Sequence, residues 1–248
     1  MTCRKKPKQR WKILHGDALD QLATLKPESV DAIVTDPPYC AGGFTEKGKQ
    51  AARAMGVRHK TRWFTGDNMG TAGLAFLLRA VACQACRILV PGGSLLVFCD
   101  WRMVPALAPA LESAGLRHQN LVVWDKGSIG LGKGFRPRHE LVLHFTKGGV
   151  KPRYFSKSGS NLIPCKRVPA RKRVHPTEKP IELLERLIEV VTPEDGLVVD
   201  PFAGSGTCGE AALRAGRQWV GIERGRAFCA TTSERLAQVE EELRCASA

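Results

Sequence analysis

The sequence predicts an α/β protein with a doubly wound, mostly parallel sheet and helices on both of its faces. Short apolar segments typical of buried strands alternate with longer amphipathic segments typical of helices along the 248 residues. Two of these strands, at 30–35 and 197–200, lead into turns rich in proline or glycine. A chain of this length can bury one large core. We therefore expect a single domain at 11–248, preceded by a basic tail at 1–10.

Hydrophobic periodicity places the elements of the first half of the chain. Apolar β-branched runs predict strands, and apolar residues three and four positions apart predict helices. The expected order is strand 11–15, helix 18–25, strand 30–35, helix 71–89, strand 94–98, helix 103–114 and strand 119–124. The double proline at 37–38 ends the second strand, because proline lacks the amide donor that a strand or helix needs. The basic connection at 40–70 is long and not periodic, which indicates a lid or a binding loop.

The second half of the chain alternates in the same way. The expected order is strand 139–146, helix 181–191, strand 197–200, helix 208–215 and strand 218–222. The glycine-rich segment 127–138 precedes a strand and not a helix, so we interpret it as a mobile loop near the substrate and not as a nucleotide phosphate loop. The segment 148–174 interleaves basic with aromatic residues, which favours nucleic-acid binding over a merely solvated surface.

The charge balance indicates a polyanionic partner. The chain has 38 Lys and Arg against 24 Asp and Glu, which gives a formal net charge of +14 and a pI of about 9.6. Nucleic acid is favoured over a membrane, because no stretch approaches the length of an apolar membrane span. The N-terminus lacks the apolar core of a secretory signal, so we expect a cytoplasmic protein. The tail at 1–10 is interpreted as a solvated segment, with a phosphate-contacting arm as the alternative.

The cysteine pattern predicts thiols and no metal site. Nine cysteines are scattered along the sequence, and Cys83 and Cys86 have CxxC spacing. They lie within a predicted helix, and no second pair follows at zinc-binding spacing. We therefore expect buried, reduced cysteines and no metal.

The stretch Asp36-Pro37-Pro38-Tyr39 carries the first candidate chemistry. It places a carboxylate and an aromatic ring at the carboxyl end of a strand, where open α/β sheets bind ligands. The exocyclic amine of adenine or cytosine is a poor nucleophile, because its lone pair is delocalised into the ring. The Asp36 carboxylate and the Pro37 carbonyl could accept its N–H groups and stabilise positive charge that develops on the nitrogen. The ring of Tyr39 could stack on an extruded base.

A second candidate stretch follows the strand at 197–200. This strand ends at Asp200, a glycine turn at 201–207 leads into a helix, and the next strand ends at Glu223. Glycines at the first turn of a βαβ unit let the backbone approach a ligand, and an acid about 20 residues further on can accept from ribose hydroxyls. Because the strands before the two stretches are expected to be parallel, we expect both stretches at the same edge of the sheet.

Both stretches resemble motifs of the DNA amino-methyltransferases, which methylate N6 of adenine or N4 of cytosine with S-adenosylmethionine. Their order is similar to that of the permuted β group, and the resemblance covers about residues 11–230. It implies a Rossmann-like methyltransferase sheet and a catalytic role for Asp36, Pro37, Pro38 and Tyr39. The cofactor-binding residues that it implies are Asp17, Ala18, Asp36, Thr177, Lys179, Asp200, Phe202, Gly204, Ser205, Gly206, Thr207 and Glu223.

The resemblance also implies which part of the cofactor each of these residues contacts. Asp17 would accept from the amino group of its adenine, although an aspartate at this position would also cap the helix at 18–25. Thr177 and Lys179 of the stretch 175–180 would contact the methionine end, and Glu223 would contact the ribose.

The chain departs from this family in its target-recognition region. Only residues 147–174 lie between the strand at 139–146 and His175, so we expect a compact recognition segment at 148–174, helped by the 40–70 loop or by a second subunit in a homodimer. The candidate DNA-binding residues are basic and lie in three loops: Lys47, Arg53, Arg58, Lys60, Arg62, Lys133, Arg136, Arg138, Arg153, Lys166, Arg167, Arg171, Lys172 and Arg173.

The sequence therefore predicts a methyltransferase that acts on N6 of a flipped adenine in double-stranded DNA. Methylation of cytosine N4 and of an RNA amine are enzymatic alternatives, and a DNA-binding module with a degenerate cofactor site is the alternative from another class. A cytosine-C5 nucleophile at Cys165 is not expected, because this cysteine lies in the basic segment and not after a cofactor strand. No nuclease motif is evident, so a self-contained restriction enzyme is not expected either.

Overall fold

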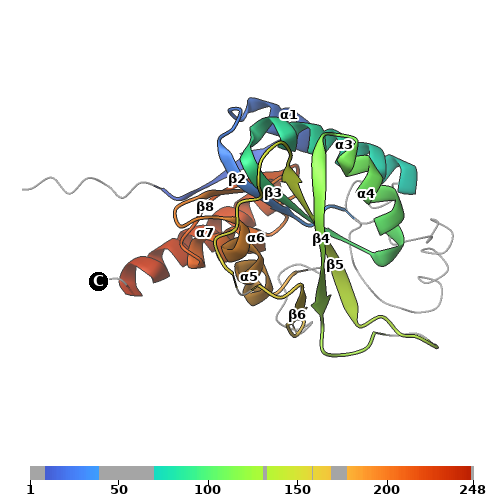
Figure 1. Ribbon diagram of the computed structural model, residues 1–248. Coiled ribbons are helices and arrows are strands. Elements are labelled where there is room, and N and C mark those ends of the chain that lie inside the picture. Colours follow the sequence, from blue (N-terminus) through green and yellow to red (C-terminus); the bar gives the residue numbers. More distant parts are fainter. Residues whose placement is uncertain (1–8, 39–69, 131–132, 158, 169–177, 247–248) are drawn as a thin grey trace, which may run out of the picture.

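A computed structural model describes residues 9–38, 70–130, 133–157, 159–168 and 178–246 of the chain. These residues form an eight-stranded sheet of order β1-β8-β7-β2-β3-β5-β4-β6 (Figure 1). The strands are β1 (Trp11–His15), β2 (Val30–Thr35), β3 (Leu89–Cys99), β4 (Leu116–Asp125), β5 (His139–Lys147), β6 (Leu162–Pro164), β7 (Leu197–Asp200) and β8 (Gln218–Glu223). Five of the seven strand pairs in this part of the chain are parallel, so the predicted doubly wound, mostly parallel sheet is confirmed.

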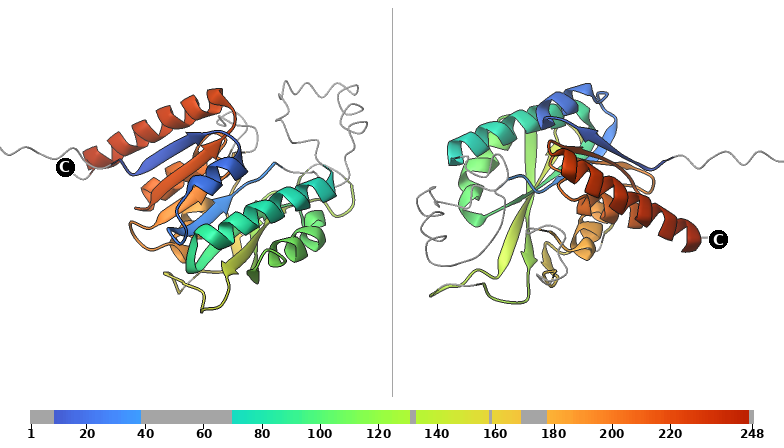
Figure 2. Two further views of the ribbon diagram at one scale, coloured as in Figure 1. Left: turned by 90° about the horizontal axis from the view of Figure 1, so that it is seen from above. Right: turned by 180° about the vertical axis from the view of Figure 1, so that it is seen from behind.

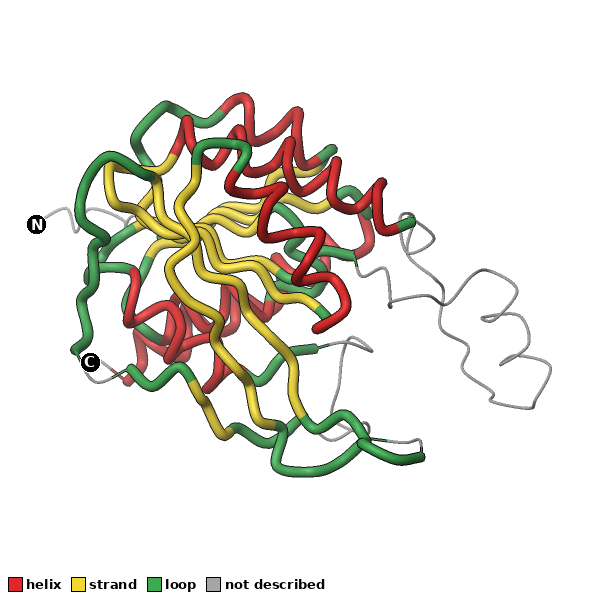
Figure 3. Tube along the Cα trace, turned by 45° about the vertical axis from the view of Figure 1, so that its right-hand side comes forward, coloured by secondary structure: helices red, strands yellow, loops and turns green. Residues whose placement is uncertain are grey.

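The two halves of the sheet differ in strand direction. From β1 to β3 every neighbouring pair is parallel, because each connection returns through a helix. Strand β5 runs antiparallel to both β3 and β4, and the loop between β4 and β5 projects beyond the sheet (Figure 3). The ends of β2, β3, β4, β7 and β8 and the start of β5 therefore lie at one edge, called the carboxyl edge below.

Helices cover both faces of the sheet (Figure 2). One face is covered by α1 (Ala18–Thr24), α3 (Thr71–Ile88) and α4 (Val104–Glu112), and the short 3-10 helix Trp101–Met103 precedes α4. The other face is covered by α5 (Ile181–Val191), α6 (Thr207–Arg214) and α7 (Arg226–Ala246). Each layer buries its own apolar cluster against the strands, one around Ile33 and Leu95 and the other around Val34 and Leu96. Alternate residues of a strand thus supply the two cores.

Helix α3 corrects the expectation that no stretch approaches a membrane span. Its length and composition would allow it to cross a bilayer, and it is the one such helix among the described residues. Its apolar side chains at Leu74, Leu78, Val81 and Ile88 are buried in the core against the sheet, as expected for a core helix.

Strands β3 and β6 and helix α7 also differ from the predicted elements. Strand β3 runs through Pro91-Gly92-Gly93 as an irregular stretch, where the register with β2 shifts between Val30 and Ala32. Strand β6 is held by pairing with β4, and the long helix α7 was not predicted.

The cysteines are free thiols in the described residues, but not all of them are buried. Cys99, Cys165 and Cys208 are buried, whereas Cys83 and Cys245 are exposed. The expectation of buried thiols is therefore wrong for these two, because each lies on the solvent side of its helix.

Candidate functional site

The two candidate stretches meet at the carboxyl edge. Strands β2 and β7 are parallel neighbours, with Ile33 opposite Val199, so Asp36 and Asp200 follow adjacent strand ends. Around them lies a cavity of about 80 Å³, well below the roughly 300–1,000 Å³ of a complete ligand pocket. The predicted residues that line it are Asp36, Lys179, Asp200, Phe202, Gly204, Ser205 and Thr207. The described residues thus form the inner part of a site.

Lys179 lies against the carboxylate of Asp36. Its Nζ is 2.5 Å from Asp36 Oδ2, and its side chain is 7% exposed. The nitrogen also lies 5.1 Å from the centre of the Phe98 ring. Burial lowers the pKa of Lys179, but Asp36 and Glu140 outweigh burial, so the pKa is raised and the ammonium stays charged. The structure thus places Lys179 on the candidate catalytic residue, and contact with a methionine group stays a prediction.

The second oxygen of Asp36 is an available acceptor. Oδ1 is buried and has no hydrogen-bond partner among the described residues. A buried acceptor without a partner is costly, so such an atom in a native site indicates a group that a ligand completes. Pro37 is buried beside it and Pro38 is partly buried. Tyr39 lies outside the described residues.

Asp200 is buried at the end of β7. Its Oδ1 accepts from Thr35 Oγ1 at 2.8 Å and from the Phe202 amide at 3.0 Å. Burial raises the pKa of Asp200 to about 7, and the nearby carboxylates of Asp36 and Glu223 add to the rise. Three acidic side chains therefore converge on this edge, which favours a ligand group with positive charge.

The glycine turn after Asp200 has a backbone that other residues rarely adopt. Gly204 has φ of 53° and Gly206 has φ of 80°, both in the left-handed region. A Cβ on Gly206 would lie 2.7 Å from Thr232 Cγ2, whereas a Cβ on Gly204 would meet nothing within 4 Å. Glu223 faces this turn, since its Oε2 accepts from the Gly204 amide at 3.0 Å. The turn therefore leaves open space beside Gly204 and a carboxylate next to it.

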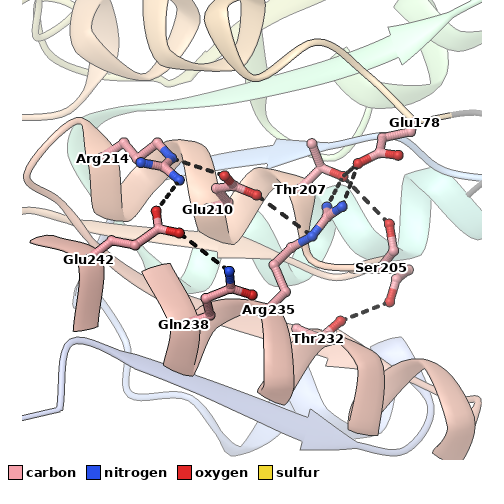
Figure 4. A network of polar contacts seen from close by, with 10 residues as sticks. Glu178, Ser205, Thr207, Glu210, Arg214, Thr232, Arg235, Gln238 and Glu242 are labelled. Carbon is pink, nitrogen blue, oxygen red and sulfur yellow. Dashed lines mark hydrogen bonds and ion pairs between the residues drawn. The ribbon is translucent and has the colours of Figure 1, made fainter. Parts of the chain in front are cut away.

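Arg235 of α7 links the glycine turn to the segment before α5 through hydrogen bonds (Figure 4). It donates to Thr207 Oγ1 at 2.8 Å and to Glu178 Oε1 at 2.6 Å, and it pairs with Glu210 at 3.6 Å. Glu210 also accepts from Arg214 at 2.9 Å. Sequence reasoning missed this role, because no function was assigned to the segment after Glu223.

Asp17 caps α1 and lies at the same edge. Its carboxylate accepts from the Leu19 amide at 2.9 Å, which confirms the capping interpretation. His15 is opposite Glu223, and the Gly16 amide donates to the Glu223 carbonyl at 3.0 Å. Asp17 and the buried Ala18 therefore follow directly beside the end of β8, and their contact with a cofactor stays a prediction.

Five of the candidate DNA-binding residues lie at the carboxyl edge. Lys133, Arg136 and Arg138 are exposed in the loop between β4 and β5. Lys166 and Arg167 run beside the start of that loop, where Arg167 donates to Ser128 Oγ at 3.3 Å. Arg138 is held by Asp125 in two hydrogen bonds of 2.6 and 2.7 Å, which lower the pKa of Asp125.

The structure does not bring Arg153 to this edge. It pairs with Asp31 at 3.0 Å at the opposite end of β2. Arg10, the last residue of the predicted tail, pairs with Asp195 and Gly216 and is also away from the site. The remaining candidate residues lie outside the described residues: Tyr39, Lys47, Arg53, Arg58, Lys60, Arg62, Arg171, Lys172, Arg173 and Thr177.

Two charged residues at the site were missed. Lys126 and Glu140 flank the loop at 127–138, and Lys126 Nζ lies 2.5 Å from Glu140 Oε1. Glu140 Oε2 lies 3.4 Å from Lys179 Nζ. The sequence could have indicated them, because Lys126 follows the end of β4 and Glu140 stands at the start of β5. Both positions lie at the edge where open α/β sheets bind ligands.

A larger cavity lies elsewhere on the sheet. It has a volume of about 750 Å³ between α5 and residues 154–157 and 159–164, with His144 and Tyr154 in its wall. Burial lowers the pKa of His144 to about 4, so this imidazole is neutral at pH 7. The smaller cavity is the better candidate site, because the acids, the buried ammonium and the glycine turn converge there.

Comparison with known proteins gives one family. The DNA methylase family (N6_N4_Mtase) matches residues 30–234. The Type II methyltransferase M2.DpnII of Streptococcus pneumoniae is 28% identical over 254 residues, which cover 94% of this chain and 92% of that protein.

Solved structures share the fold. The M1.HpyAVI–SAM complex is 25% identical, with a TM-score of 0.66, and the match covers 91% of this chain and 98% of that one. The PvuII DNA methyltransferase, which is cytosine-N4-specific, is 19% identical with a TM-score of 0.71, and the match covers 93% of this chain and 91% of that one. This second likeness concerns the fold alone.

The substitution Asp200→Asn should change how stability depends on pH. Aspartate in an unfolded chain has a pKa of about 3.9, whereas the folded value is about 7. Between these values the folded protein holds a proton that the unfolded chain has released, so the free energy of unfolding should fall as pH rises, by up to about 1.4 kcal/mol per pH unit. The variant keeps an acceptor for Thr35 and Phe202 but should lack this slope.

Urea unfolding of both proteins between about pH 4 and pH 8 measures the difference. The other titrating groups are common to both proteins and cancel. Identical pH slopes for the two proteins would contradict a raised pKa for Asp200.

Proposed function

The chain belongs to the N6/N4 DNA methylase family, and we propose that within this family it methylates the N6 amine of an adenine flipped out of double-stranded DNA. The observation that carries the proposal is Asp36 Oδ1, a buried acceptor that has no hydrogen-bond partner in the part of the chain that the structure describes. This acceptor lies beside the glycine turn, in the cavity that Asp200 also lines. Chemistry on a base amine needs an acceptor of this kind next to a methyl donor.

The methyl donor is S-adenosylmethionine, and the residues of the glycine turn fit it. When bound, it supplies a methyl group on a positively charged sulfonium. Gly204 leaves open space where a side chain would otherwise stand, and Glu223 offers a carboxylate for ribose hydroxyls. Asp200 and Glu223 add acidic groups beside the turn, and these suit a cationic ligand.

The roles of the catalytic residues follow from the geometry of Asp36. Lys179 holds Oδ2, so the orientation of the carboxylate is fixed and Oδ1 remains for the target amine. The Pro37 carbonyl would accept the second N–H. Together these acceptors would draw the nitrogen toward tetrahedral geometry and stabilise its developing positive charge. Tyr39 would stack on the extruded base.

Adenine is favoured over cytosine by the residue at position 36. Members of this family that act on cytosine N4 tend to have serine in place of this aspartate. Methylation of cytosine N4 is the second candidate, because the same acceptors would suit either amine. Methylation of an RNA amine would also use this chemistry.

The carboxyl edge also offers a surface for a nucleic-acid backbone. Lys133, Arg136, Lys166 and Arg167 are exposed there, and Phe135 is fully exposed between the first two. Backbone contacts of this type position a duplex without reading its sequence. The described part of the short recognition segment holds only the strand β6, so a homodimer would help to complete recognition. Sedimentation that shows a monomer both with and without DNA would contradict the dimer.

Nucleoside analysis tests the function. The protein is incubated with methyl-labelled S-adenosylmethionine and mixed-sequence duplex DNA, the DNA is digested, and the nucleosides are separated. N6-methyladenine supports the proposal and N4-methylcytosine supports the second candidate. Label in RNA but not in DNA, or no transfer together with no binding of the cofactor in calorimetry, would overturn the proposal.

The substitution Asp36→Asn should lower kcat by about 100- to 1,000-fold, because it removes the charge that stabilises the developing cation on the amine. Asp31→Asn is the matched control, since Asp31 lies on the same strand at the opposite edge and pairs with Arg153. We expect it to lower stability and to leave kcat within a few-fold. Single-turnover methylation and thermal unfolding of both variants separate the two effects, and an unchanged rate in Asp36→Asn would refute the assigned role.

Removal of the basic side chains at Lys133, Arg136, Lys166 and Arg167 should weaken DNA binding and reduce its salt dependence. Each phosphate contact that is lost should lower the slope of log K against log salt by about 1. The control replaces Lys26, Arg79, Arg117 and Lys151, which are exposed and lie away from this loop. Fluorescence anisotropy with labelled duplex at several salt concentrations measures both slopes. In each variant the four residues are replaced by Gln. Equal slopes for the two variants would contradict DNA binding at these four residues.

A further inference from the structure

Glu140 lies at the start of β5, between two lysines. Its Oε1 is 2.5 Å from Lys126 Nζ, and its Oε2 is 3.4 Å from Lys179 Nζ. The Glu140 side chain is 24% exposed, and burial raises its pKa, but the two lysines outweigh burial and the pKa is lowered. Glu140 is therefore a charged group at an edge where an unpaired charge would be costly.

The ammonium of Lys179 is shared between carboxylates from two strands. It lies 2.5 Å from Asp36 Oδ2 at the end of β2 and 3.4 Å from Glu140 at the start of β5. The Phe98 ring lies 5.1 Å from its nitrogen, and the Trp124 ring lies at the same distance from the nitrogen of Lys126. These contacts hold two cations and two anions in an alternating row: Lys126, Glu140, Lys179 and Asp36.

We propose that Glu140 is a positioning residue for methyl transfer, which holds Lys179 between itself and Asp36 and so keeps Asp36 Oδ1 available to the target amine. The inference rests on the function proposed above for Asp36. Glu140 touches neither the amine nor the cofactor in this scheme and acts through Lys179.

The electrostatics explain why a second carboxylate is needed. A buried ammonium with one anionic partner would be drawn fully onto Asp36, where its three donors would compete with the amine for both oxygens. Glu140 provides an opposing attraction from β5, so Lys179 stays on the Oδ2 side. Lys126 balances the charge of Glu140, which leaves the row of four groups neutral.

The same row connects the catalytic carboxylate with the loop at 127–138. Lys126 and Glu140 stand at the two ends of this loop, and the Lys126 amide donates to the Arg138 carbonyl at 3.0 Å. Lys133 and Arg136 of the loop are the groups proposed to contact DNA. Residues at the two ends of the loop that is proposed to contact DNA therefore help to fix the position of Lys179.

The substitution Glu140→Gln tests the role. It keeps the shape of the side chain and removes its charge, so kcat should fall by about tenfold or more, with KM for DNA and for the cofactor nearly unchanged. The carboxylates that pair with Lys179 are those of Asp36 and Glu140, and Glu140 in turn pairs with Lys126. Loss of one carboxylate should lower the pKa of Lys179, so the alkaline limb of the kcat–pH profile should move to lower pH.

A double variant separates positioning from simple charge balance. Glu140→Gln leaves Lys126 unpaired and should lower the melting temperature, whereas Glu140→Gln with Lys126→Met removes one charge of each sign and should restore it. The double variant should not restore kcat, because Lys179 still lacks its second partner. Glu28→Gln is the matched control, since Glu28 pairs with Lys147 at the other end of β5 at 2.9 Å, and it should leave kcat and the pH profile unchanged.

The inference is overturned if Glu140→Gln keeps kcat within about twofold of the wild-type value, or if kcat recovers together with the melting temperature in the double variant. A wild-type protein that transfers no methyl group to DNA would instead overturn the proposed function. The two failures are therefore distinguishable within one set of assays.

Discussion

The ammonium of Lys179 is the interaction on which the arrangement of the carboxyl edge depends. Asp36, Glu140, Asp200 and Glu223 all approach this edge, where burial and, to a smaller extent, the nearby carboxylates raise the pKa of Asp200. A buried, charged lysine compensates the two carboxylates that it touches and fixes how one of them is oriented. The edge can thus keep Asp36 Oδ1 without a hydrogen-bond partner among the described residues, which is what a base amine requires.

The permuted order of the motifs does not disturb the site, because the strands that precede them are parallel. The stretch after β2 and the stretch after β7 are far apart in the sequence, yet their strands are hydrogen-bonded neighbours. The connections from β1 to β2, from β2 to β3 and from β7 to β8 return through helices, so every strand end that carries a motif lies at the same edge. Helix α7 then secures the glycine turn from outside through Arg235. A different order of the same units would give the same site.

Local signals predicted much of the fold and of the site. Strands β1, β2 and β7 and helix α5 begin and end where periodicity and the neighbouring prolines and glycines predicted. The Asp36 and Asp200 stretches meet as expected. What the sequence did not predict depends on contacts between distant residues. Strand β6 exists through its pairing with β4, Lys179 faces Asp36 rather than solvent, and Glu140 acquires its role from two lysines that only the fold brings to it. The sequence places such residues at strand ends, but it does not show which of them pair with each other.

The most direct measurement is a crystal structure of the protein with an unreactive analogue of S-adenosylmethionine and a duplex that contains the target base. We expect Asp36 Oδ1 at about 3 Å from the exocyclic nitrogen of an extruded adenine, while Lys179 Nζ remains on Oδ2. An amine nitrogen that is held by other groups, with the carboxylate of Asp36 turned away from the base, would contradict the central role assigned to this ion pair.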